Sequence, residues 1–309
     1  MFLAGDNAAA SERRTVDEKP LAPGLYLVAT PIGNLEDITL RALRVLKSAD
    51  RIACEDTRQT QKLLNHFGID TRTTSCHAHN EAEKAREFIE ELKQGARIAV
   101  VSDAGVPGIS DPGMALARAA IDAGIAVYPI PGANAAISAL VASGLPTANF
   151  LYAGFLPPKS GARRAELERL AALVATDEPL TLVFYEAPHR ILETLEDVEN
   201  VWGGDCRVVV ARELTKLHEE FLRGAVSEVR VNLAARDRVQ GEITLLVEAK
   251  SLASNATGAM SSLKDRVAEL QRTESLDEMV ALKRAARERG ISKSEAYREL
   301  QRERARSSR

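Results

Sequence analysis

Three short segments of the chain each bring acidic and basic side chains together. They are residues 55–58 (Glu-Asp-Thr-Arg), 186–190 (Glu-Ala-Pro-His-Arg) and 212–216 (Arg-Glu-Leu-Thr-Lys). A carboxylate or an imidazole can accept a proton there, and a cation can bind phosphate or stabilise developing negative charge. A loop ion pair explains each segment equally well when it is taken alone. Three such segments exceed what a scaffold needs, so they are candidates for acid–base chemistry and anion binding.

A second kind of segment is rich in glycine and proline. Residues 102–113 (Ser-Asp-Ala-Gly-Val-Pro-Gly-Ile-Ser-Asp-Pro-Gly) cannot continue a helix, so their backbone can lie against a ligand. Residues 30–34 and 129–136 also combine Pro and Gly, and the small residues of 129–136 leave a helix N-terminus open to a carboxylate. An ordinary strand-to-helix connection is the alternative for each.

Several classes of site are excluded. The dinucleotide fingerprint, the P-loop and the serine hydrolase elbow have no match in the chain. His77 and His79 have no cysteine nearby, so we predict no metal site. The three cysteines, Cys54, Cys76 and Cys206, are too widely spaced for a disulfide framework and fit a reducing cytoplasm. No apolar run reaches the roughly 18–20 residues that span a membrane.

The composition is that of a globular protein. The 309 residues are 45% hydrophobic and 28% charged, which indicates about two domains. The net charge of −3 excludes a chain coated in basic residues but not a local basic patch. With 1 Trp, 5 Tyr and 7 Phe, the sequence shows no cluster of aromatic residues. A stacking platform for single-stranded bases is therefore disfavoured.

Strands and helices alternate along most of the chain, which predicts an α/β fold with a mainly parallel sheet. A helix is expected over residues 35–47, after the first strand. The organisation we predict is a disordered tail (1–23), an α/β domain (24–144), a second α/β domain (145–250), a linker (251–260) and a helical extension (261–309). Ligands bind beyond the carboxyl ends of parallel strands. The loops expected there are 30–37, 55–58, 102–113 and 129–135.

The extension differs from the rest of the chain in charge. It holds 13 Lys and Arg against 9 Asp and Glu, a net +4, whereas the remainder has a net −7. Two capping boxes, Ser275 with Glu278 and Ser292 with Glu295, predict helix starts. A basic helical pair can contact nucleic acid phosphates, and a solvated appendage is the alternative.

Six of these segments, read together and in order, resemble one known family, the ribosomal RNA small subunit methyltransferase I family of the tetrapyrrole methylase superfamily. The resemblance covers residues 25–250 and rests on ATPIGNLEDIT (29–39), CEDTR (54–58), SDAGVPGISDPG (102–113), PIPGANAAISAL (129–140), FYEAPHR (184–190) and RELTKLHEE (212–220).

The resemblance implies two α/β domains with S-adenosylmethionine in the cleft between them, and a cytoplasmic homodimer. It implies 2′-O-methylation of a cytidine in the decoding region of 16S rRNA, on the assembled 30S subunit. The cofactor residues that it implies are Pro31, Gly105, Val106, Pro107, Ile109, Ser110, Asn134, Ala135, Tyr185, Ala187 and Thr244. Val106 departs from the Gly-Asp-Pro loop common in the superfamily, which favours an rRNA over a tetrapyrrole substrate.

The chemistry of methyl transfer requires alignment of the acceptor oxygen and a proton acceptor. Glu186 is our choice of catalytic base, with His189, Glu55, Asp56 and Glu213 as the other candidates. The candidates for RNA contacts are Arg58, Arg190, Arg212 and Lys216. Two other functions stay open: methylation of a tetrapyrrole or another small molecule, and RNA binding without catalysis.

Overall fold

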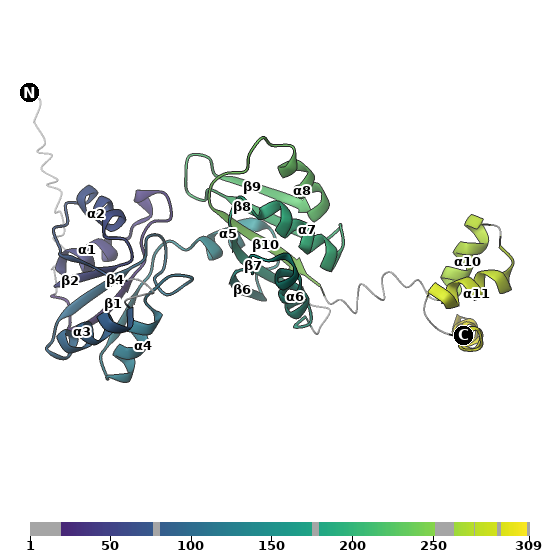
Figure 1. The fold of residues 1–309 in the computed structure, drawn as a ribbon, viewed down its shortest axis with the longest axis horizontal. Helices are drawn as coiled ribbons and strands as arrows, with labels where there is room; N and C mark the ends of the chain where they lie inside the picture. The colour runs from purple at the N-terminus through teal and green to yellow at the C-terminus, as the bar shows by residue number, and fades with distance from the viewer. Residues whose placement is uncertain are drawn as a thin grey trace, which may run out of the picture. The chain divides into compact units, whose positions relative to one another are not determined.

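The computed structural model describes residues 20–76, 81–174, 179–250, 263–274, 276–288 and 292–307. The chain divides between Ala135 and Ala136 into two compact units (Figure 1). Several predictions fall outside the described residues. They concern the tail as far as residue 19, the linker, the pair His77 and His79, and the Ser275 cap.

The first unit contains a five-stranded sheet in the order β3-β2-β4-β1-β5. Every pairing in it is parallel, as predicted. The strands are short and apolar because a parallel sheet is covered on both faces. They are β1 (Gly24–Val28), β2 (Arg51–Cys54), β3 (Thr73–Ser75), β4 (Arg97–Val101) and β5 (Val127–Ile130).

Two helices cover each face of this sheet. Helices α1 (Leu40–Ser48) and α2 (Thr57–His66) pack on the face that includes Val28, and α3 (Glu81–Lys93) and α4 (Met114–Asp122) pack on the face that includes Leu25. The neighbouring strands β1 and β4 therefore send their following helices to opposite faces. Such a divergence opens a ligand site beyond the strand ends.

The predicted helix over 35–47 is interrupted. A 3₁₀ turn, η1, occupies Leu35–Asp37, and α1 begins only at Leu40. The side chain of Thr39 accepts a hydrogen bond from the Ala42 amide at 3.1 Å. A cap of this kind satisfies a free amide of the first helical turn, so it starts a new helix at this point.

The second unit contains a five-stranded sheet in the order β6-β7-β10-β8-β9. Only β6 and β7 are parallel in this unit, and its other pairings are antiparallel. The loop 213–219 between β8 and β9 is too short for a parallel crossover and forces a hairpin. The strands are β6 (Phe150–Phe155), β7 (Leu180–Glu186), β8 (Arg207–Arg212), β9 (Glu220–Ala225) and β10 (Ile243–Ala249).

Three helices pack together on one face of the second sheet, namely α6 (Ser160–Ala171), α7 (Ile191–Trp202) and α8 (Val226–Ala234) (Figure 1). Helix α5 (Ala135–Ser143) also belongs to this unit from Ala136 on. Arg223 of β9 donates to the last carbonyls of α5, at 2.7 Å to Ala142 and 3.1 Å to Ser143. The division of the chain therefore falls at the first residue of α5.

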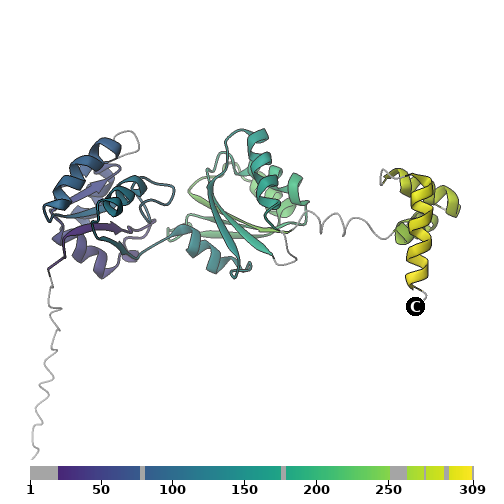
Figure 2. The same ribbon diagram turned by 90° about the horizontal axis from the view of Figure 1, so that it is seen from below.

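The predicted helical extension has a core of its own. Helices α10 (Leu263–Glu274), α11 (Glu278–Glu288) and α12 (Lys293–Ser307) pack around leucine and alanine side chains (Figure 2). The capping box of Ser292 and Glu295 is confirmed, since the two residues exchange hydrogen bonds at 3.0 and 3.2 Å. Within the described ranges, no helix is long and apolar enough to cross a membrane.

Candidate active site

The loops after β1 and β4 are joined directly at the carboxyl edge of the first sheet. The Thr30 amide donates to the Gly105 carbonyl at 2.8 Å, and the Gly105 amide donates back to Thr30 at 3.1 Å. The Thr30 hydroxyl also donates to the Ser102 carbonyl at 3.3 Å. Two segments that are 72 residues apart in the chain thus form a single structure at the predicted ligand edge.

Gly105 is the point where three loops meet. Its φ of +78° lies in the left-handed region, and a Cβ there would lie 3.3 Å from Ile32 Cγ2 and 3.7 Å from the Ala133 carbonyl oxygen. A side chain at residue 105 would therefore be both strained and crowded. The loops that carry Pro31, Gly105 and Asn134 converge as the sequence predicted, and glycine at position 105 permits their close approach.

The rest of the loop 102–113 has an unusual backbone. Gly108 and Ser110 have φ of +85° and +59°, and Ser110 is a non-glycine residue in the left-handed region. Strain of this kind persists where the surrounding structure imposes it, often at ligand sites. Pro107 is buried, Val106 is partly buried, and Ile109 is 39% exposed. The predicted cofactor residues of this loop thus include an exposed apolar side chain on a rigid turn.

Carboxylates gather beside this loop, which the sequence reasoning did not recognise. Asp103 accepts a hydrogen bond from the Asp56 amide at 3.2 Å. Burial, together with the nearby charges of Glu55 and Asp103, raises the pKa of Asp111 to about 6. The available signal was the position of these acids after two neighbouring strands, β2 and β4. This edge of the first unit is therefore negatively charged.

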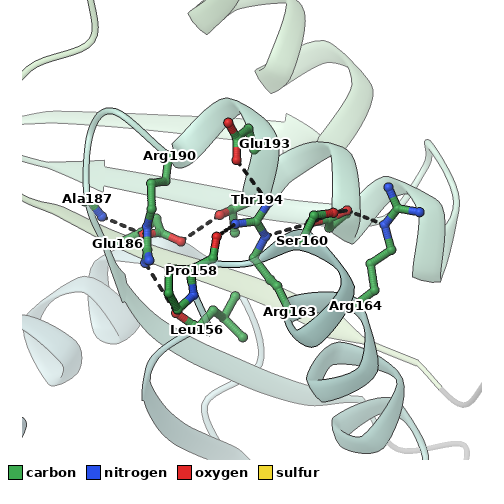
Figure 3. A network of polar contacts seen from close by, with 11 residues as sticks. Leu156, Pro158, Ser160, Arg163, Arg164, Glu186, Ala187, Arg190, Glu193 and Thr194 are labelled. Atoms are coloured by element: carbon green, nitrogen blue, oxygen red, sulfur yellow. Dashed lines mark hydrogen bonds and ion pairs between the residues drawn. The ribbon is translucent and has the colours of Figure 1, made fainter.

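The carboxylate of Glu186, the predicted catalytic base, accepts hydrogen bonds from other residues of the second unit. Its carboxylate is buried and accepts hydrogen bonds from the Ala187 amide at 2.7 Å, the Thr194 hydroxyl at 2.7 Å and the Arg190 Nε at 2.9 Å (Figure 3). A base needs a free lone pair that the substrate can reach. In this structure the Glu186 carboxylate is engaged within its own unit, where its contacts hold the end of β7 against the start of α7.

A second buried ion pair lies beside Glu186. Arg163 is fully buried and donates to Asp197 at 2.6 Å and to the Pro158 carbonyl at 3.3 Å (Figure 3). Asp197 also accepts hydrogen bonds from Arg164 and from Ser160. This network fixes the start of α6 against α7, and with it the loop that follows β6.

The predicted cofactor residues of the second unit come together. Tyr185 of β7 is paired with Thr244 of β10 in the antiparallel register, and Ala187 follows at the end of the same strand. Thr244 is buried, whereas Tyr185 and Ala187 are partly exposed. These residues therefore share one edge of the second sheet.

Three of the four RNA candidates are engaged inside the second unit. Arg190 binds Glu186, and Arg212 binds Glu220 at 3.0 Å. Lys216 binds Glu213 at 2.9 Å and a second carboxylate at 3.1 Å. These cations stabilise loops, which is the alternative that the sequence left open.

The fourth RNA candidate, Arg58, is open to solvent. Its side chain is 88% exposed and is held by Asp56 alone among its ion-pair partners in the described structure. A surface pair of this kind contributes little to stability, so Arg58 is available to a phosphate.

The loop 212–216 is nonetheless an unusual structure. Glu213 and Thr215 have φ of +53° and +65°, and both are non-glycine residues. A Cβ at Gly241 would lie 2.4 Å from Glu213 Cγ, so only glycine lets the Glu213 side chain fold back over the chain. The Glu213 carboxylate then accepts from the Glu242 amide at 2.9 Å. This second base candidate is therefore also occupied.

Aromatic side chains form a cluster in the second unit. Tyr152 and Phe155 each contact Tyr185, with ring centroids 5.1 and 5.8 Å from that of Tyr185, respectively. The expectation that the chain has no aromatic cluster is wrong. Tyr152 and Tyr185 are 33 positions apart in sequence, and the rings meet because β6 and β7 are neighbours.

Proteins similar to this chain are methyltransferases. Residues 24–230 match the tetrapyrrole (corrin/porphyrin) methylases. The chain is 54% identical over 224 residues to ribosomal RNA small subunit methyltransferase I of Halalkalibacterium halodurans, covering 72% of this chain and 75% of the relative. It is 51% identical over 225 residues to the protein of the same name from Escherichia coli O157:H7, covering 72% and 77%.

Solved structures of lower identity show the same fold. Uroporphyrin-III-C-methyltransferase from Thermus thermophilus has a TM-score of 0.51 at 21% identity, covering 75% of this chain and 98% of the other. A structure of that enzyme complexed with S-adenyl homocysteine has a TM-score of 0.50 at 18% identity, covering 73% and 98%. The fold and the sequence relatives agree with each other. The chain therefore belongs to the ribosomal RNA small subunit methyltransferase I family of the tetrapyrrole methylases.

Proposed function

We propose that this protein transfers the methyl group of S-adenosylmethionine to the 2′-hydroxyl of a cytidine in the decoding region of 16S rRNA, on the assembled 30S subunit. The observation that carries the proposal is the junction of loops at Gly105, in a chain whose relatives are named rRNA methyltransferases. We further propose that the protein acts as a homodimer in the cytoplasm, where ribosomal subunits are found.

The loops of the first unit fit such a cofactor. A glycine at position 105 lets three loops converge without a side chain between them, and the exposed side chain of Ile109 offers an apolar surface to an adenosine. The residues that would hold the cofactor here are Pro31, Gly105, Val106, Pro107, Ile109, Ser110, Asn134 and Ala135. Tyr185, Ala187 and Thr244 are the corresponding residues of the second unit.

The charge of the first unit's loop edge also suits this cofactor. S-adenosylmethionine supplies an electrophilic methyl group on a positively charged sulfur. Burial and the negative charges of Glu55 and Asp103 raise the pKa of Asp111, and the same two charges attract a cation. The neutral product, which lacks the sulfonium, would be attracted less strongly.

The hydroxyl proton must pass to an acceptor as the oxygen takes the methyl group. Glu186 and Glu213 are not proposed for this role, because each carboxylate already accepts hydrogen bonds from its own unit. His189 is exposed just beyond Ala187, and an imidazole can accept a proton at neutral pH. We therefore propose His189 as the acceptor, with Glu55 as the alternative from the first unit.

Contacts to RNA phosphates are proposed for Arg58 and for the helical extension. Arg58 is exposed, and the extension presents the exposed cations Lys283, Arg284, Arg287, Lys293 and Arg298 on α11 and α12. Such contacts make binding strongly dependent on salt.

Methyl transfer from labelled S-adenosylmethionine tests the proposal. The protein is incubated with assembled 30S subunits, naked 16S rRNA or a tetrapyrrole, and the label is located by nuclease digestion and mass spectrometry. Label on a cytidine ribose of 30S subunits supports the proposal, and label on a base or on a tetrapyrrole refutes it. His189→Gln should slow a single turnover without weakening binding of S-adenosylhomocysteine, and an unchanged rate would remove His189 as the acceptor.

A further inference from the structure

Three aromatic rings gather at the carboxyl ends of β6 and β7. Tyr152 and Phe155 each contact Tyr185, at interplanar angles of 68° and 65°. Aromatic pairs prefer this edge-to-face arrangement, which fixes the orientation of each ring. We call Tyr152, Phe155 and Tyr185 the aromatic patch.

A β-bulge brings the two rings of β6 to the same face of the sheet. Side chains alternate along a regular strand, so residues 152 and 155 would normally point in opposite directions. The register with β7 shifts between Tyr152 and Gly154, and Gly154 has a φ of +67°. Ala153 and Leu156 consequently both pack against the core. Tyr152 and Phe155 therefore both point away from it, as bulges near functional sites often arrange.

The patch presents one open ring on a fixed support. Phe155 is 57% exposed, whereas Tyr152 and Tyr185 are half-buried, and Phe155 contacts Tyr185 edge to face. A phenylalanine has no polar atom to interact with water, so its exposure on an ordered strand suits a planar partner. The backbone after Phe155 is held by Arg190, which donates to the Leu156 carbonyl (Figure 3).

The patch also adjoins the residues that the proposed reaction uses in this unit. Tyr185 belongs both to the patch and to the predicted cofactor residues, and it pairs with Thr244. Ala187 follows two positions later in the chain. A nucleotide whose base lies on Phe155 would keep its ribose within a few ångströms of this edge, as transfer of a methyl group requires.

We propose that the aromatic patch stacks a base of the RNA substrate, with Phe155 as the open ring. The inference rests on the proposed function, since it assumes an RNA substrate. Every nucleobase has a flat π face, so an exposed ring supported from below can hold it without reading its identity. Phe155 is then a positioning residue that aligns the ribose, and it contributes no group to the chemistry.

Three substitutions at Phe155 test the proposal on the full-length protein. Phe155→Tyr keeps the ring, Phe155→Leu keeps only apolar volume, and Phe155→Ala removes both. We expect the Ala and Leu variants to raise KM for 30S subunits about tenfold, which corresponds to about 1.4 kcal/mol, and the Tyr variant to stay near wild type. Phe150→Ala is the matched control, because Phe150 begins the same strand and is 43% exposed. It should leave KM unchanged.

Two further measurements distinguish stacking from other roles of Phe155. The dissociation constant for S-adenosylhomocysteine and the sedimentation coefficient should stay the same in all variants. A weakened dissociation constant would mean that the patch holds the cofactor, and a change in sedimentation would mean that it contacts another copy of the chain. Either result, or an unchanged KM for Phe155→Ala, overturns the inference. If wild-type protein methylates no 30S ribose, the proposed function itself fails, which is a separate outcome.

Discussion

Substitution of Glu186 by Gln separates a structural role from a catalytic one. The carboxylate is buried, and its two oxygens accept hydrogen bonds from an amide, a hydroxyl and the Arg190 guanidinium. Gln keeps the volume and one acceptor oxygen but removes the negative charge. Arg190, whose side chain is only 16% exposed, would then lose its counter-ion.

The expected cost follows from these contacts. Breaking a buried ion pair costs about 3–5 kcal/mol, and hydrogen bonds to charged groups contribute about 1.5–3 kcal/mol each. Because Gln still accepts one hydrogen bond, we expect the free energy of unfolding of the second unit to fall by about 2–3 kcal/mol. Glu193→Gln is the control, since Glu193 is 67% exposed and lies 3.4 Å from Arg163. It should change stability by less than about 0.5 kcal/mol.

The single tryptophan of the chain makes the assay specific. Trp202 ends α7 and is buried in the core of the second unit, so its fluorescence in urea reports the unfolding of that unit. Single-turnover methyl transfer at 20 °C, well below the unfolding transition, measures the chemical step. We expect Glu186→Gln to lower the urea midpoint and to keep the single-turnover rate within about threefold of wild type, an effect of less than about 0.7 kcal/mol on the barrier.

The opposite pattern would refute this reasoning. If Glu186→Gln leaves the urea midpoint in place and slows the single turnover a hundredfold or more, the carboxylate accepts the proton. The contacts of the free protein would then have to open when the substrate binds.

Three further predictions concern the loop edge of the first unit and the extension. Asp111→Asn should stabilise the first unit by about 1–2 kcal/mol at pH 8. The raised pKa of Asp111 corresponds to roughly 3 kcal/mol, and the expected gain is smaller because solvent screens the charges. Because the pKa of Asp111 is raised to about 6, the wild-type protein loses stability as the pH rises through 6, so the stability gained by Asp111→Asn should vanish near pH 4. Urea unfolding followed by circular dichroism at pH 8 and pH 4 measures this gain. An equal gain at pH 4 would contradict the raised pKa of Asp111. Gly105→Ala should weaken S-adenosylhomocysteine binding at least tenfold, as measured by calorimetry. Gly124→Ala is the control and should leave the affinity unchanged, because Gly124 has a φ of +72° but no atom within 4 Å of the added Cβ. Equal affinities of the two variants would mean that the loop junction at Gly105 does not hold the cofactor. Truncation after Lys250 should weaken 30S binding and flatten its dependence on salt, because it removes a net charge of +4 in residues 261–309. Filter binding across salt concentrations measures both effects. Unchanged binding would mean that the extension does not contact the RNA.

Local patterns predicted much of the fold. The sequence predicts a strand over 51–54 and a helix over 57–66, and β2 and α2 have these bounds. The apolar run ends at Cys54, and the Asp56 side chain caps α2 by accepting a hydrogen bond from the Arg58 amide at 2.8 Å. The irregular backbone of the Gly- and Pro-rich loop was likewise recognisable, since its positive φ angles favour glycine. The interruption of the predicted helix at Thr39 was missed because threonine, which caps helices, can also occupy a position inside a helix.

The sequence predicted which loops form the candidate site, but it did not predict the roles of the individual charged residues. Sequence order placed Gly105 and Asn134 at strand ends, and the parallel sheet brought their loops together. The roles of Glu186 and Lys216 were not accessible, because whether a charged side chain is free or paired depends on residues elsewhere in the chain. Asp111 was missed for the same reason, as its raised pKa comes from burial and from Glu55 on another strand.

The sequence by itself determined the family, the alternation of strands and helices, and the loops at the carboxyl ends of the first sheet's strands, because these depend on residue types at short spacing. Only the tertiary structure decided which charges remain exposed and which rings meet. Tyr152 and Phe155 share a face because a bulge shifts the register of β6 against β7, and Glu186 is occupied because α7 folds back over it. Both depend on contacts between separate elements, which residue spacing along the chain does not encode.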